Sequence, residues 1–302
     1  MNVDQAIDQA CSAVGIIPPT RRAFGRWLKT DTLSGKSGKG DGRVIMDDDR
    51  VTAWNWQSGE KETVWLKDEM TPADRQKIAR KIEKDNRERQ QRADQVAGIA
   101  ERLVADATLS QHPYLAAKGF PNEQALVLAA DHIKAVAGAY LVSGERAIAI
   151  PARLGNQIRS VQFIWEDGTK KFLAGGQIEG TCHRIAKGGD TFQCEGFATG
   201  LTLRTALKGL RRSDTILCCF SASNVLAVSR AVKGRSFIVT DHDKPIEHYD
   251  GLGTGEYFAQ QSGKPYTMPP LLGDDLNDMH KREGIFAVQR LLSNFMREAR
   301  AG

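Results

Sequence analysis

The sequence predicts an α/β protein, α+β over the whole chain, because regions of different pattern follow one another. From residue 188 onward, short apolar runs typical of buried strands alternate with stretches of helical periodicity, the pattern of a parallel sheet flanked by helices. Residues 109–187 are richer in strand patterns, and residues 71–108 are predicted to form one long helix. Residues 1–67 are expected to form a small domain in front of that helix. We therefore expect four consecutive parts.

The first part, residues 1–67, is basic and rich in tryptophan. A short helix is predicted from Asn2 to Val14, and short strands with glycine-rich turns are predicted up to Leu66. The cations and tryptophans of this part are Arg21, Arg22, Arg26, Lys29, Lys36, Lys39, Arg43, Trp27, Trp54, Trp56 and Trp65. Such interleaving suits single-stranded nucleic acid, because phosphates meet the cations and bases stack on the rings. The alternative is that the tryptophans form the core of a small domain.

The second part, residues 71–108, is predicted to be a helical linker. Thr71 is a suitable N-cap, and Pro72 fits the first turn of the helix. Residues 83–95 are almost all charged or amide, so they must be solvated, and an apolar patch begins at Val96. We expect a semi-rigid arm whose charges form either a solvated face or a nucleic-acid contact.

The third part, residues 109–187, is predicted to be a strand-rich subdomain. Its strands are expected at 146–153 and 158–165, and a Lys-aromatic-Leu segment follows within residues 167–173. The cations that we expect to meet nucleotide phosphates or a template are Arg146, Arg153, Lys170, Lys171 and Arg184. A lysine is a flexible point charge well suited to a triphosphate. Each of these cations could equally be an ordinary surface residue.

The fourth part, residues 188–302, alternates predicted strands and helices. Strands are expected at 191–194, 215–220, 236–240 and 266–268, and helices at 199–208, from a cap at Ser223, and at 256–261. This alternation predicts a parallel sheet with right-handed crossovers. Functional groups in such sheets gather beyond the carboxyl ends of the strands.

Acidic residues follow these elements in a fixed order, at the ends of the first and third strands and after the fourth. They are Glu195, Asp241, Asp243, Asp274, Asp275 and Asp278. Crowded carboxylates repel one another unless a cation lies between them, and they are the hard ligands that Mg²⁺ prefers. The pattern therefore predicts a divalent-metal site for phosphoryl or nucleotidyl transfer.

The acids are expected to have different roles. Asp241 and Asp243 are the first choice of metal ligands, because an i, i+2 pair leaving a strand can present both carboxylates to one region. Glu195 is either a ligand or the base that accepts a hydroxyl proton. The trailing acids are expected to complete the metal shell, although one of them could instead cap the helix that follows.

This arrangement resembles the Toprim domain, which primases, type IA and II topoisomerases and some nucleases share. Glu195-Gly196 follows one strand, Asp241-His242-Asp243 follows a later one, and the resemblance extends over roughly Asp190 to Glu283. The strands at 146–173, with a Lys-aromatic-Leu segment at their end, look like the subdomain that precedes Toprim in DnaG-type primases. Residues 112–120 are similar to a segment common in phage and plasmid primases.

The resemblance implies a DNA primase, a nucleotidyltransferase that makes short RNA primers on single-stranded DNA from nucleoside triphosphates. It implies Mg²⁺ or Mn²⁺ as the cofactor, with two ions in the catalytic site. It also implies a phage, plasmid or other mobile-element replication system, with room for a separate replicative helicase as partner.

Two features depart from the bacterial replicative enzyme of this family, which carries an N-terminal zinc ribbon. The cysteines are Cys11, Cys182, Cys194, Cys218 and Cys219, and no two of them form a Cys-X-X-Cys pair. No zinc is therefore expected. An arginine expected before the Lys-aromatic-Leu segment is also missing, with Gln162 in that neighbourhood.

Composition limits the remaining alternatives. A net charge of +5 does not by itself identify a nucleic-acid binder. No apolar run is long enough for a membrane span, so a cytoplasmic protein without membrane contact is expected. A Toprim metal-dependent nuclease would use the same carboxylates, but its usual relatives carry an ATPase domain, and none is expected from this sequence. A non-catalytic accessory protein that binds single-stranded DNA is the other alternative, and the intact acids argue against it.

Overall fold

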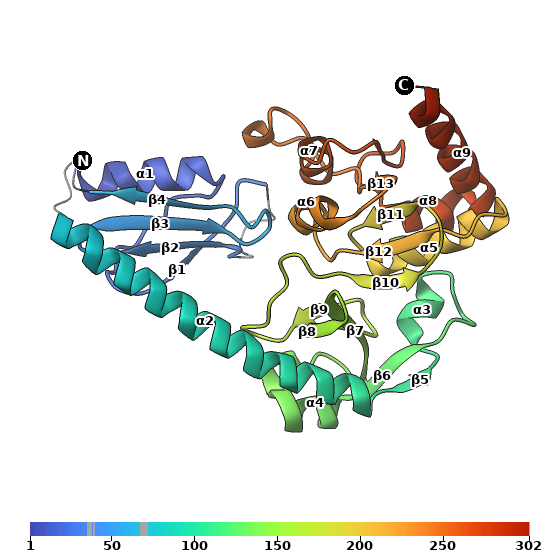
Figure 1. Ribbon diagram of the computed structural model, residues 1–302, viewed down its shortest axis with the longest axis horizontal. Helices are drawn as coiled ribbons and strands as arrows, with labels where there is room; N and C mark the ends of the chain where they lie inside the picture. The colour runs from blue at the N-terminus through green and yellow to red at the C-terminus, as the bar shows by residue number, and fades with distance from the viewer. Residues whose placement is uncertain (35–37, 39, 67–71, 302) are drawn as a thin grey trace. The chain divides into compact units, whose positions relative to one another are not determined.

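The computed structural model describes residues 1–34, 38, 40–66 and 72–301, and it has an α+β fold (Figure 1). The chain divides into two compact units. Unit 1 comprises residues 1–83 and 244–254, and unit 2 comprises residues 84–243 and 255–302. Lys36, Lys39 and Thr71, which the sequence analysis singled out, lie outside the described residues.

Unit 1 is a four-stranded antiparallel sheet with a helix on one face. Its elements are α1 (Val3–Ala13), β1 (Leu28–Thr30), β2 (Gly42–Met46), β3 (Arg50–Asn55) and β4 (Lys61–Trp65), with the strands in the order β1-β2-β3-β4. A capping box between Asn2 and Gln5 begins α1. The helix buries Ile7 and Cys11 against strand residues such as Val44, so the core lies between α1 and the sheet.

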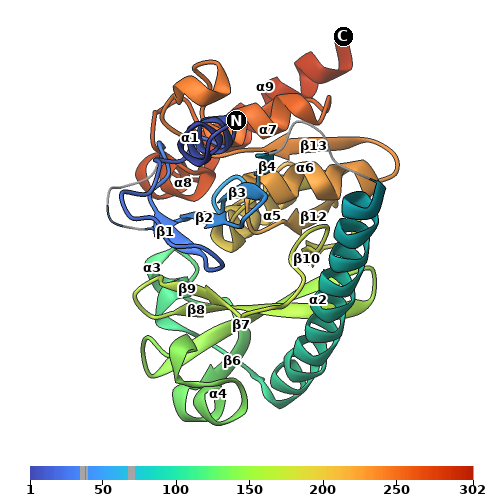
Figure 2. The ribbon, with the colours of Figure 1, turned by 90° about the vertical axis from the view of Figure 1, so that its left-hand side faces the viewer.

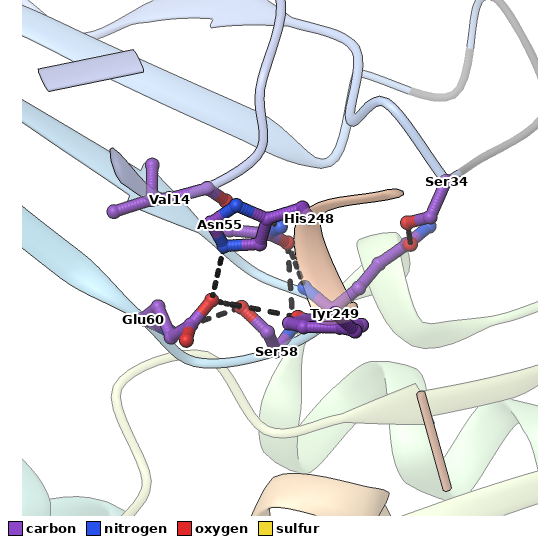
Figure 3. Close-up of polar contacts among 8 residues, drawn as sticks. Val14, Ser34, Asn55, Ser58, Glu60, His248 and Tyr249 are labelled. Carbon is purple, nitrogen blue, oxygen red and sulfur yellow. Dashed lines mark hydrogen bonds and ion pairs between the residues drawn. The ribbon is translucent and has the colours of Figure 1, made fainter. Parts of the chain in front are cut away.

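A segment from far along the chain completes unit 1. Residues 244–254 contain the short 3-10 helix η2 (Glu247–Tyr249), and Tyr249 is buried. Figure 3 shows His248 and Tyr249 beside Glu60: the His248 Nε2 atom lies 3.5 Å from the Glu60 carboxylate, and the Tyr249 hydroxyl donates to it over 3.4 Å. In sequence this segment lies within residues 188–302, the predicted fourth part. Its packing instead assigns it to unit 1.

The long helix α2 (Pro72–Asp106) belongs to both units. Residues 84–92 are exposed, as the run of charges predicts. Val96, Ala100 and Leu103 are buried in the core of unit 2. The expected linker over 71–108 therefore differs from the structure in its second half, because the apolar patch that begins at Val96 packs as core.

Unit 2 contains two five-stranded sheets, and the first is antiparallel. Its strands are β5 (Thr108–Ser110), β6 (Ala125–Ala129), β7 (Arg146–Leu154), β8 (Gln157–Trp165) and β9 (Lys170–Phe172), paired in that order. The helical elements of this region are α3 (Pro113–Ala117), α4 (Ala130–Ala137) and η1 (Ala139–Leu141). Both faces are buried: Ala149 and Phe163 pack with α2, whereas Ile148 and Ile164 pack with Phe197 of the second sheet region.

The second sheet is parallel except at one edge. Its order is β10-β12-β11-β13-β14, with β10 (His183–Ala186) antiparallel to β12 (Thr215–Cys218), and β11 (Thr191–Cys194), β13 (Ser236–Val239) and β14 (Tyr266–Thr267) parallel. The helices are α5 (Phe197–Gly209), α6 (Ala222–Ala231), α7 (Thr254–Gln261), α8 (Leu276–Glu283) and α9 (Ile285–Ala301) (Figure 2). Phe192 and Phe237 from neighbouring strands pack against Phe295 of α9.

Two details of this region differ from the sequence analysis. The strand β10 was expected within the 109–187 part, but its hydrogen bonds join it to β12 of the second sheet. Short edge strands carry little pattern of their own, so sequence alone does not say which sheet they join. The N-cap of α6 is Ser221, whose side chain accepts from the Asn224 N–H, rather than Ser223. Among the described residues, no helix is long and apolar enough to cross a membrane.

Candidate active site

Two of the predicted acids leave adjacent parallel strands at the same edge. Glu195 follows β11 and Asp241 lies two residues after β13, and the two strands pair with Cys194 opposite Val239. The carboxyl ends of parallel strands meet at one edge of a sheet, which brings these two acids together. Each residue is partly exposed, but the Glu195 Oε1 and Asp241 Oδ1 atoms are buried.

These two buried oxygens have no hydrogen-bond partner among the described residues. Burial raises the pKa of Glu195 well above its usual value, and the charges of Asp241 and Asp243 raise it further. Burial likewise raises the pKa of Asp241 to about 7, with the charges of Asp275 and Asp243 as the next causes. An unpaired carboxylate oxygen in the interior is costly and requires a partner that the polypeptide does not provide.

Asp243 is held by the backbone at the far end of the 244–254 segment. Its Oδ2 atom accepts a hydrogen bond from the Gly255 N–H over 3.0 Å, so the segment leaves unit 2 at Asp243 and returns beside it. Gly255 must be a glycine. A Cβ atom there would lie 1.9 Å from the Thr240 hydroxyl and 3.0 Å from Glu195 Oε1. The backbone therefore approaches the acids more closely than any side chain would allow.

The trailing acids have structural partners. Asp275 is the N-cap of α8: its side chain accepts from the Asp278 N–H over 2.8 Å, and the Asp278 side chain accepts from the Asp275 N–H over 3.3 Å. Asp274 forms an ion pair of 2.5 Å with Arg282. The helix-capping alternative thus applies to Asp275 and Asp278. The charges of both residues raise the pKa of Asp241, which indicates that both lie near it.

The carboxylate oxygens are chemically suited to a hard divalent cation, but the described side chains do not form a complete coordination shell. Among the described residues, no three His, Cys, Asp or Glu side chains are grouped so that they could hold a metal ion together. Glu195 and Asp241 each present one unpaired oxygen, whereas one oxygen of Asp243 is occupied by Gly255. Hard oxygen ligands of this kind suit Mg²⁺ or Mn²⁺. Glu195 and Asp241 could therefore supply two of the oxygen ligands of such a metal ion.

Of the two predicted lysines, only Lys170 faces the acids. In the sheet register Lys170 pairs with Ile164, whose side chain packs toward Phe197, and the charge of Lys170 lowers the pKa of both Glu195 and Asp241. Successive side chains of a strand point to opposite faces. Lys171 accordingly points the other way, and its ammonium group donates to the backbone carbonyls of Tyr140 and Val142 over 3.1 Å each.

The three predicted arginines are not gathered at the acids. Arg146 begins β7 and Arg153 lies near its end, which at the usual strand rise puts their Cα atoms roughly 23 Å apart. The Arg153 guanidinium donates to the Asn156 carbonyl in the turn before β8 over 3.0 Å. Arg184 is exposed on the edge strand β10. The charge of Lys170 is among the main causes that set the pKa values of Glu195 and Asp241.

Phe220 is a site feature that the sequence analysis missed. It follows β12 with a φ of 74°, a left-handed conformation that is rare for a bulky side chain. Its N–H donates to the Glu195 carbonyl over 2.9 Å, and its ring packs edge-on against Phe172 with centroids 5.3 Å apart. The strained residue thus links the backbone of Glu195 to the strand that carries Lys170. No sequence signal marks a positive φ at a phenylalanine, whereas the glycines around Gly255 could have indicated its close approach.

Comparisons with known proteins include a distant sequence relative. No family model matches the chain. Over 200 residues the chain is 25% identical to a protein described as DNA primase TraC from Escherichia coli, and the alignment covers 62% of this chain and 17% of that protein. The chain thus spans about a sixth of the length of this curated relative.

Solved structures that are similar at a low level include two primase structures. One is the RNA polymerase domain of Mycobacterium tuberculosis primase DnaG, with a TM-score of 0.33, 15% identity, and coverage of 49% of this chain and 55% of that one. The other is a chain in a complex of bacteriophage T7 lagging-strand DNA polymerase with primase domains of two gp4 subunits, with a TM-score of 0.35, 14% identity, and coverage of 50% and 76%. These scores establish no shared fold, and the sequence similarity to a DNA primase is the comparison that bears on function.

Proposed function

We propose that this protein is a Toprim-type DNA primase that makes short RNA primers on single-stranded DNA by metal-dependent nucleotidyl transfer. The observation that carries the proposal is the pair of buried, unpartnered oxygens of Glu195 and Asp241, beside a lysine, at the carboxyl ends of adjacent parallel strands. The distant sequence similarity to a DNA primase supports it. A place in phage, plasmid or mobile-element replication, and a separate helicase as partner, are part of the same proposal.

In this proposal the carboxylates hold Mg²⁺ or Mn²⁺. Asp241 would bind through Oδ1, and Glu195 would either bind through Oε1 or accept the proton of the attacking 3'-hydroxyl. Asp243, Asp275 and Asp278 would add charge to the same region, because they already raise the pKa values of the two buried acids. The chemistry that the metal supplies when bound is a lowered hydroxyl pKa and neutralisation of the charge that develops on the leaving pyrophosphate.

The remaining residues of the site would orient the nucleotide. Lys170 is the cation that faces the acids, and its ammonium group would bind the triphosphate as a point charge. Phe172 and Phe220 form an apolar pair beside it. Lys171 would hold the strand β9 to the 140–142 region through its two carbonyl contacts. Arg146, Arg153 and Arg184 would then contact the template or product.

Incubation of the full chain with single-stranded DNA, labelled ribonucleotides and Mg²⁺ or Mn²⁺ tests this function. We expect new short oligomers whose sequence depends on the template, and we expect none from Asp241→Asn. A shortened template without new oligomers would instead indicate the nuclease that uses the same carboxylates. DNA binding without either product would indicate an accessory protein and would overturn the proposal.

A further inference from the structure

Three tryptophans lie exposed on one face of the unit 1 sheet. Trp27 is 43% exposed, Trp54 is 36% exposed and Trp56 is 51% exposed, although large aromatic side chains are mostly buried in folded proteins. The helix α1 covers the opposite face, where Val44 and Ala53 are fully buried. The core of unit 1 therefore does not include these three tryptophans, and the alternative that they form it does not hold for them.

The strand register places these rings among cations. Lys29 pairs with Arg43, Arg43 with Trp54, and Trp54 with Lys61, so one row across all four strands reads cation, cation, aromatic, cation. The strand positions on this face are Lys29, Arg43, Ile45, Arg50, Thr52, Trp54, Lys61, Thr63 and Trp65. None of them is acidic. The acidic residue Glu62 of β4 alternates to the α1 side, because it pairs with the buried Ala53.

The aromatic cluster is ordered rather than loosely exposed. The Trp27 and Trp54 rings lie 6.2 Å apart and the Trp54 and Trp56 rings 5.6 Å apart, both edge to face. The Arg43 guanidinium stacks 3.7 Å from the centre of the Trp56 ring and donates to the carbonyls of Gly40 and Gly42. The Lys61 ammonium lies 5.9 Å from the centre of the Trp27 ring. Each exposed ring is thus held by a neighbour, and little conformational freedom would be lost on binding.

We propose that this face, defined by Trp27, Trp54, Trp56, Lys29 and Lys61, binds single-stranded DNA. Bases would stack on the exposed rings, and the backbone phosphates would meet the two lysines, which is how proteins bind single strands without reading sequence. The charge of the face selects this occupant: its strand positions carry Lys29, Arg43, Arg50 and Lys61 and no acidic residue, while Asp47, in the turn before β3, is paired with Arg50. Such an excess of cations complements a polyanion. The DNA binding itself stands independently, and only its identification as the primase template rests on the proposed function.

Stacking is tested with the full chain and a fluorescently labelled oligo(dT) in an anisotropy titration. The double variant Trp27→Leu/Trp56→Leu keeps apolar side chains at both exposed positions but removes the large rings. We expect its affinity to fall by about 10-fold or more, since each base stacked on an aromatic ring contributes about 1–3 kcal/mol. Phe286→Leu is the matched control, because Phe286 is 74% exposed on α9 of unit 2, and we expect unchanged affinity. Circular dichroism would check that each variant is folded.

The phosphate contacts are tested by salt dependence. For a single strand the slope of log affinity against log salt is about 0.7 per phosphate contacted. Lys29→Gln/Lys61→Gln should therefore lower the slope by roughly 1.4. Lys208→Gln/Lys233→Gln removes the same charge from exposed positions in unit 2, and the slope should stay at the wild-type value.

The outcomes separate this proposal from the proposed function. Affinity lost in the tryptophan variant but kept in Asp241→Asn supports the binding face, whether or not the protein makes primers. Unchanged oligo(dT) affinity and salt slope in both unit 1 variants would overturn it. If the tryptophan variant instead changes only the sedimentation of the free protein, the face joins two copies of this chain and the proposal is also wrong.

Discussion

Unit 2 places carboxylates inside the protein, whereas unit 1 places tryptophans outside it. Raising the pKa of Asp241 from 3.8 to about 7 corresponds to a destabilisation on the order of 4 kcal/mol for the ionised form. Leaving Trp56 half exposed forgoes much of the roughly 2–3 kcal/mol that full burial of a large apolar side chain would contribute. Each arrangement is less stable alone than an ordinary core or surface would be. Buried carboxylates in unit 2 indicate a cation as the ligand. Exposed tryptophans among cations in unit 1 indicate a polyanion whose bases stack on the rings.

The largest effect is expected from Asp241→Asn, which removes one of the buried charges of unit 2. We expect loss of primer synthesis by about 1,000-fold or more, because the unpaired Oδ1 charge is the proposed metal ligand. In metal-free buffer at pH 8 the same variant should unfold at higher urea, because a repelling buried charge has been removed. Asp131→Asn, at an exposed carboxylate, is the control. A destabilised Asp241→Asn protein would show that the carboxylate has a structural partner after all.

Gly255→Ala tests how closely the backbone must approach the acids. The added methyl group would lie 1.9 Å from the Thr240 hydroxyl, so the backbone must shift and Asp243 would lose the position that the Gly255 N–H fixes. We expect synthesis to fall by about 10- to 100-fold, with oligo(dT) affinity unchanged. Gly98→Ala, where a methyl group meets nothing within 4 Å, should leave synthesis intact. Equal activity of the two variants would mean that Asp243 is dispensable.

The adjacent lysines provide a comparison within a single strand. Lys170→Ala should raise the KM for nucleoside triphosphates by about 10-fold, since the charge that faces the acids is lost. Lys171→Ala should leave that KM unchanged and lower the free energy of unfolding by about 1 kcal/mol, because two hydrogen bonds to carbonyls disappear. Steady-state kinetics and urea unfolding measure the two effects. The reverse pattern would assign the nucleotide contact to Lys171.

A last effect, confined to the pH dependence of stability, concerns His183, a partly exposed residue outside the acid cluster whose Nδ1 atom is buried. Burial lowers the pKa of His183 from 6.5 to about 4. The unfolded chain therefore binds a proton at His183 that the folded chain does not, and this residue's contribution to stability is lost as the pH falls from about 6.5 to about 4. The loss is on the order of 3 kcal/mol at most. His183→Phe should show a shallower fall over this window than His132→Phe, the control at a partly exposed histidine that lies 2.9 Å from Asp106. Parallel pH curves would mean that His183 stays solvated.

The sequence was sufficient for the parts that depend on repeating patterns. The alternation of apolar runs and helices predicted the parallel strands around Glu195 and Asp241, and the rule that such strands end at one edge brought the two acids together before any coordinates were known. Alternation along β9 implies that Lys170 and Lys171 point to opposite faces, but it does not say which of them faces the acids. That is set by the pairing of β9 with β8.

The rest depends on contacts between segments far apart in sequence. Residues 244–254 join unit 1 through His248 and Tyr249, and nothing in their own composition indicates Glu60 as the partner. The edge strand β10 likewise joins a sheet that its four residues do not specify. The tryptophans were recognised as either core or binding surface, and only the pairing of Trp54 with Arg43 and Lys61 places them on the open face.

Binding of Mn²⁺, followed by electron paramagnetic resonance, tests the central claim most directly. The claim is that Glu195 Oε1 and Asp241 Oδ1 have no hydrogen-bond partner because the two carboxylates bind a divalent cation. We expect saturable Mn²⁺ binding to the full chain and a loss of affinity of at least about 10-fold in Glu195→Gln/Asp241→Asn, with oligo(dT) affinity retained. Equal Mn²⁺ binding by the wild type and the double variant would contradict the account, because the buried carboxylates would then have no ligand to explain them.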